Sequence, residues 1–87
     1  MVATMVREFR NHEFTGEARL YRVDPPLDGN SFVVVSATVA PYSGAETYIF
    51  PANEDGTVRS WLELDGSYRG GLDHDEALRR AGYTVTP

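Results

Sequence analysis

The chain contains no cysteine. This absence excludes disulfide bonds, thiolate catalysis and metal centres held by cysteine, and it leaves the redox compartment open. Lysine is absent as well, because all eight basic residues are arginine. Without lysine the chain has neither a Schiff-base nucleophile nor the lysine of a phosphate-binding P-loop.

Long apolar runs are also missing. The longest one, residues 32–35, is far too short for a membrane span or for the core of a signal peptide. We therefore expect a cytoplasmic protein without membrane contact. No serine lies in a G-x-S-x-G elbow, and the two histidines, His12 and His74, form no HExxH pattern. The sequence thus predicts no catalytic residues, and we do not expect an enzyme.

The charge is acidic and unevenly spread. The 87 residues carry a net charge of −5, with +1 in residues 1–22 and −6 in residues 23–87. Backbone binding to nucleic acid needs a clustered basic surface, so we expect no nucleic-acid ligand. The charge distribution does not exclude an acidic face that binds a basic partner. The length fits one small domain over residues 1–87.

Four segments have the composition of β-strands: residues 17–24, 31–40, 46–50 and 58–64. Residues 31–40 give the strongest signal, because their odd positions are all apolar and predict one fully buried face. An Asp-Gly pair at 55–56 predicts a hairpin before the fourth strand. Residues 1–16 are a short strand or an irregular lead-in, and residues 83–86 offer a further strand.

A helix is predicted between Asp73 and Gly82. Asp73 is suited to be the N-cap and Glu76 to complete a capping box, while Leu72 can pack on Ala77 as a hydrophobic staple. Gly82 can end the helix in a Schellman motif. Together these signals predict an α+β fold: an antiparallel meander of four or five strands, with one C-terminal α-helix packed on one face.

The residues around the start of the predicted helix resemble two kinds of ligand site. The glycine-rich segment 66–71 would suit a phosphate, but Asp73, Asp75 and Glu76 stand where the anion would lie. The run 73–76 offers metal ligands, but neighbouring helical side chains diverge by about 100°. His12 beside Glu13 is equally weak evidence for a metal site. We therefore expect no metal and no cofactor.

Aromatic and arginine residues near the fourth predicted strand suggest a surface for a protein partner. Trp61, Tyr68 and Arg69 are of the types that dominate binding hot spots, and Tyr48 and Tyr42 can join them. The alternative is that Trp61 fills a gap under the N-terminal segment.

Three motifs carry a resemblance: ETYIFPA at 46–52, W-x-E-L-x-G-S at 61–67, and G-G-L-D-H-x-x-A-L-x-x-A-G-Y at 70–83. On these residues the second half of the chain resembles small uncharacterised proteins of actinobacteria and their bacteriophages. The resemblance implies no activity and no catalytic residues.

The leading hypothesis is a non-enzymatic interaction domain, phage-encoded, that binds a host protein or a second copy of itself as a homodimer. One alternative is an acidic mimic of nucleic acid that blocks a DNA-binding protein. The other is a small hydrolase or ligand-binding domain, which would need a pocket with converging polar groups.

Overall fold

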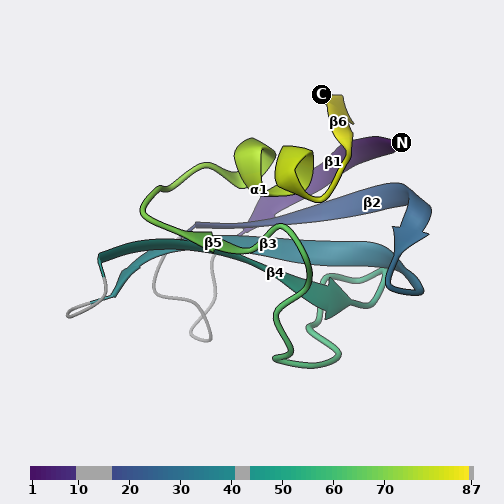
Figure 1. The fold of residues 1–87 in the computed structure, drawn as a ribbon. Helices are drawn as coiled ribbons and strands as arrows, with labels where there is room; N and C mark the ends of the chain where they lie inside the picture. The colour runs from purple at the N-terminus through teal and green to yellow at the C-terminus, as the bar shows by residue number, and fades with distance from the viewer. Residues whose placement is uncertain (10–16, 41–43, 87) are drawn as a thin grey trace.

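The computed structural model describes residues 1–9, 17–40 and 44–86. It contains six strands and one helix (Figure 1). In chain order these are β1 (Val2–Phe9), β2 (Glu17–Leu27), β3 (Asn30–Ala40), β4 (Gly44–Ala52), β5 (Tyr68–Arg69), α1 (His74–Arg80) and β6 (Thr84–Thr86).

The strands form one curled sheet in the order β5-β4-β3-β2-β1-β6. Successive strands from β1 to β5 pair antiparallel, while β6 pairs parallel with β1. The predicted α+β class and mostly antiparallel sheet are confirmed, but the sheet has more strands than expected and contains a parallel pair. Chain order explains that pair: α1 carries the chain across the face of the sheet from β5, at one edge, to β6, at the other (Figure 1).

The N-terminal segment is a strand and not an irregular lead-in as far as Phe9; residues 10–16 lie outside the described residues. It pairs with β2 from Val2 opposite Asp24 to Phe9 opposite Ala18, with a register shift between Met5 and Arg7. This long-range pairing places Ala3 in the core. Among the described residues, no helix is long and apolar enough to cross a membrane.

The prediction of a fourth strand at 58–64 is wrong. Val58 makes one isolated bridge to Ala52, and the residues after it are irregular. They still bond to the edge of β4: the amide of Leu64 donates to the carbonyl of Ile49 (2.8 Å), and the amide of Ile49 donates to Ser67 Oγ (2.8 Å). The carbonyl of Pro51 accepts from the amide of Arg59 at the same edge (2.8 Å), but proline has no N–H to return, so the ladder cannot continue.

The two faces of the sheet bury separate sets of apolar side chains. On the helix side Val33, Val35 and Ile49 pack with Ala77 and Leu78. On the opposite side a smaller cluster contains Ala18, Leu20, Val34 and Ala52. The alternation predicted for residues 31–40 is confirmed over Val33, Val35 and Ala37, whereas Val39 is exposed.

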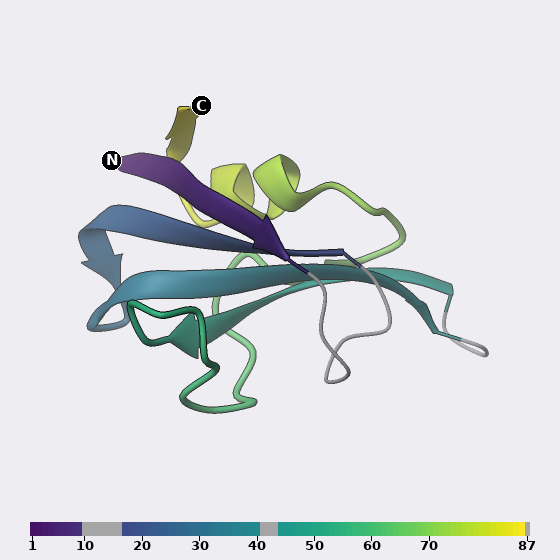
Figure 2. The same ribbon diagram turned by 180° about the vertical axis from the view of Figure 1, so that it is seen from behind.

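The first part of the segment after β4, residues 53–60, folds under the second face of the sheet, on the side away from α1 (Figure 2), whereas Leu64 and Gly66 return to the helix side. Its loop is tied to β1 because the guanidinium of Arg7 donates to the carbonyl of Asp55. The loop therefore lies over the part of this face that is nearest to β1.

The ends of α1 follow the predicted capping in most respects. Asp73 is the N-cap, and its carboxylate accepts from the amide of Glu76 (3.1 Å). At the other end the amides of Gly82 and Tyr83 donate to the carbonyls of Arg79 and Leu78 (3.0 and 2.9 Å), which is a Schellman motif.

The prediction that the Glu76 side chain completes a capping box is wrong. The Glu76 carboxylate does not bond the amide of Asp73; it pairs with Arg79 and Arg80 one turn on (3.2 and 3.3 Å). The amide of Asp73 donates instead to Thr47 Oγ1 (3.3 Å), which anchors the helix start to β4.

Asp73→Ala should lower the free energy of unfolding by about 1 kcal/mol, because the amide of Glu76 loses its acceptor. Asp73→Ser retains a capping oxygen and should recover most of the loss. Chemical denaturation measures both. Equal midpoints for the alanine variant and the parent protein would contradict the role of this cap.

Two glycines form a matched pair for testing how closely the segment after β4 approaches the helix. Gly66 and Gly70 share a φ of +103°, so alanine is equally strained at both, by about 1 kcal/mol. A Cβ at Gly66 would also meet the carbonyl oxygen of Ala77, whereas nothing lies within 4 Å of one at Gly70. In thermal denaturation, Gly66→Ala should be less stable than Gly70→Ala by a further 1–3 kcal/mol, roughly the cost of overpacking. Equal losses would show that the segment can move away from the helix.

Candidate functional site

Three of the four predicted partner-binding residues lie on the face of the sheet that α1 does not cover. Side chains alternate along β4, so Tyr48 points away from the helix while its neighbours Thr47 and Ile49 point toward it. Arg69 on β5 pairs in register with Glu46, which places its guanidinium on the same face as Tyr48. Trp61 reaches this face from the irregular segment and contacts Phe50.

Arg69 is held between two partners. Its Nε donates to the Tyr48 hydroxyl oxygen (3.3 Å) and lies 3.6 Å from a carboxylate oxygen of Glu46. The Glu46 carboxylate is almost fully buried, and its hydrogen bond with the Tyr48 hydroxyl raises the pKa of that hydroxyl above its ordinary value. Arg69 itself is largely exposed, so its outer nitrogens face solvent in a preset orientation.

Trp61, Tyr48 and Arg69 form one row, in which Phe50 lies between the rings of Trp61 and Tyr48. Phe50 is nearly buried; its ring centre lies 6.0 Å from that of Tyr48 and 5.1 Å from that of Trp61, with the Trp61 ring edge-on at 74°. Trp61 remains 56% exposed, so it does not fill a gap in the core as the alternative interpretation held. Phe50 and Glu46 were missed from the sequence. Positions 46, 48 and 50 share one face of a strand, so the sequence could have placed Glu46 and Phe50 beside Tyr48.

Tyr68 lies on the opposite face, because neighbours in a strand point to opposite sides of the sheet. It packs against the helix-side core, its ring lies 4.3 Å beneath the guanidinium of Arg80, and its hydroxyl is 3.4 Å from the carbonyl of Asp73. Tyr68 therefore does not join the row formed by Trp61, Tyr48 and Arg69. Tyr42 and His12 lie outside the described residues.

A cluster of charges lies on the helix side around Arg19 of β2. Its guanidinium is 3.3 Å from Glu8, 3.7 Å from Glu17 and 3.9 Å from Asp75. The hydroxyl of the buried Tyr21 donates to Asp75 (2.9 Å), and burial raises the pKa of Tyr21 to about 12. Over residues 1–9, 17–40 and 44–86, no three acidic or histidine side chains are grouped so that they could hold a metal ion.

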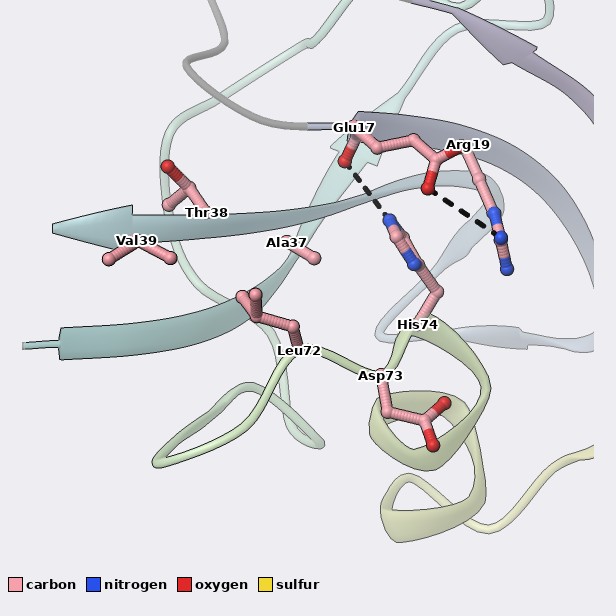
Figure 3. A pocket seen from close by; sticks show the side chains of 8 residues that line it. All are labelled: Glu17, Arg19, Ala37, Thr38, Val39, Leu72, Asp73 and His74. Carbon is pink, nitrogen blue, oxygen red and sulfur yellow. Dashed lines mark hydrogen bonds and ion pairs between the residues drawn. The ribbon is translucent and has the colours of Figure 1, made fainter.

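A pocket of about 450 Å³ opens beside this cluster (Figure 3). Its walls come from the start of β2, the end of β3 and the start of α1, and they include Glu17, Arg19, Val39, Leu72 and His74. Leu72 is one of these walls, is 52% exposed and is not packed against the cluster that contains Ala77, so the predicted staple of Leu72 on Ala77 is wrong. The sequence did not predict this pocket, because three segments far apart in the chain, 17–19, 37–39 and 72–74, build it.

Tyrosine ionisation should make stability fall at high pH. The pKa of Tyr21 rises from 10.0 to about 12 on folding, so the unfolded chain loses this proton first. The stabilisation from Tyr21 is complete below pH 10 and is lost as the pH rises from about 10 to 12. The free energy of unfolding, measured in urea at several pH values, should fall less steeply across that range in Tyr21→Phe than in the parent protein. Parallel profiles would contradict the shift.

Comparison of the chain with models of known protein families, with curated proteins and with solved structures finds no significant match. The resemblance to small proteins of actinobacteria and their bacteriophages stays a prediction.

Proposed function

We propose that this protein is a non-enzymatic interaction domain that binds a protein partner through the sheet face opposite α1, with Trp61, Tyr48 and Arg69 at the centre of contact. One observation carries the proposal. Side chains from β4, β5 and the segment between them converge into one exposed row, although they are separated in the sequence.

The row has the physical features of a binding hot spot. Trp61 offers a large ring whose orientation is fixed by Phe50, and Arg69 offers a guanidinium fixed by Tyr48 and Glu46. Residues held in place before binding lose little conformational entropy when the partner arrives, so more of the contact energy appears as affinity.

The partner is a different protein or a second copy of this chain. A row that contains both an arginine and an aromatic ring can meet itself across a two-fold axis, because cation–π contacts would then form in both directions. A role in a bacteriophage and a cytoplasmic location belong to the same proposal and stay predictions from the sequence.

Trp61→Ala should weaken partner binding by roughly thirtyfold or more, as loss of a hot-spot residue does. Partners are captured from an actinobacterial lysate, identified by mass spectrometry and then titrated as purified proteins. Sedimentation equilibrium of the parent and the variant tests the homodimer.

Arg69→Ala and Arg79→Ala are the matched pair for this experiment, because both arginines are exposed but Arg79 lies on the helix side. Only Arg69→Ala should weaken binding. Unchanged affinity in Trp61→Ala, with the fold intact by circular dichroism, would refute the proposal. If Trp61→Ala unfolds, Trp61→Phe, which keeps an apolar ring against Phe50, provides the same comparison.

A further inference from the structure

The pocket at the start of α1 has an apolar side and a polar side. Val39 and Leu72 are 64% and 52% exposed, and together with Ala37 they form the apolar side. Glu17, Arg19 and His74 lie across from them (Figure 3). Large aliphatic side chains that line a hollow beside polar groups suit a ligand with an aliphatic body and a polar end.

The charges around the polar side favour a cation. Among the described residues, Arg19 faces three carboxylates: that of Glu17, which lines the pocket with it, and those of Glu8 and Asp75, which lie outside the lining, so negative charge exceeds positive charge in these ion pairs. Glu17 lies 3.7 Å from Arg19, which is longer than a hydrogen bond, and its side chain is partly exposed. Its carboxylate therefore keeps hydrogen-bonding capacity toward the pocket.

The buried histidine holds the polar side of the pocket in place. His74 is only 5% exposed, and its Nε2 lies 3.0 Å from the carbonyl oxygen of Glu17. A carbonyl only accepts hydrogen bonds, so we assign a proton to Nε2, which donates to it. The same contact fixes the backbone that carries the Glu17 side chain beside the pocket.

From this cavity, its aliphatic wall and its excess of acceptors, we propose that the pocket binds a primary alkylammonium group, with the aliphatic chain against Val39 and Leu72 and the ammonium on Glu17. Two sources share this chemistry: the side chain of a lysine in a protein, and a free aliphatic amine or diamine. Lysine packs its methylene stem on apolar surface in this way while its charged end meets acceptors. The pocket lies on the helix side of the sheet, so this proposal is independent of the row around Trp61.

The test is a titration of the ¹⁵N-labelled protein, followed by the amide chemical shifts of residues 72–75. Three probes carry the ammonium: n-pentylamine, 1,5-diaminopentane and Nα-acetyl-lysine methylamide, all cationic at pH 7.5. Pentanol and pentanoate have similar chains without the positive charge. The amines should give saturable shifts, whereas pentanol and pentanoate should not saturate at the same concentrations. Tighter binding of the lysine amide than of the diamine assigns the site to a protein partner, and the reverse order assigns it to a free amine.

Variants separate the two sides of the pocket. Glu17→Gln should weaken amine binding by about tenfold or more, because an ionic hydrogen bond is lost while the side-chain shape is kept. Leu72→Ser should weaken it severalfold through the apolar wall. Glu63→Gln, an exposed acid outside the pocket lining, is the matched control and should bind as the parent does.

Three outcomes would overturn the proposal: no saturation by any amine, equal shifts from pentanol and pentylamine, or unchanged amine affinity in Glu17→Gln. The dispersed amide spectrum of each variant shows whether it has folded. If Glu17→Gln does not fold, the comparison of amine with alcohol on the parent protein decides the question without it.

Discussion

Packing of α1 against one face of the sheet is the interaction on which the rest of the structure depends. Leu78 and Ala77 bury against Val33, Val35 and Ile49, and Thr47 anchors the first turn through its hydroxyl. The same helix carries the chain from β5 to the opposite edge of the sheet, where Tyr83 turns back into the core. Without this packing neither β6 nor the pocket at the helix start would be in place.

Covering one face also decides what the other face presents. A six-stranded sheet with a single short helix leaves its second face to loops, and the loop tied by Arg7 and Asp55 lies over only part of it. Leu20 and Val34 are buried on that side, whereas Trp61 remains exposed. The row formed by Trp61, Tyr48 and Arg69 is therefore a consequence of an unevenly covered sheet. A small domain buries a limited share of its surface, so some of its aromatic side chains stay exposed in the folded protein.

The acidic character of the chain takes a specific form on the helix side. Arg19 meets carboxylates from β1, β2 and α1, so two neighbouring strands and the distant helix share one cation. Tyr21 adds a hydrogen bond from the buried sheet to Asp75 on the helix. These contacts join the helix to the strands by polar interactions at the rim of the apolar core. They also leave negative charge in excess beside the pocket.

The sequence by itself determined what depends on near neighbours. The Asp73 cap and the Schellman motif at Gly82 and Tyr83 involve residues three to five positions apart, and β3 follows from alternation within one segment. Tertiary structure alone decided the pairing of β6 with β1, the loss of the predicted strand at 58–64, and the pairing of Tyr68 and Arg69 with β4 as a short strand. The physical reason is that each of these outcomes rests on hydrogen bonds and packing between segments far apart in the chain. Pro51 of the neighbouring strand β4 contributes to the absence of the strand at 58–64, because it offers that edge a carbonyl but no N–H.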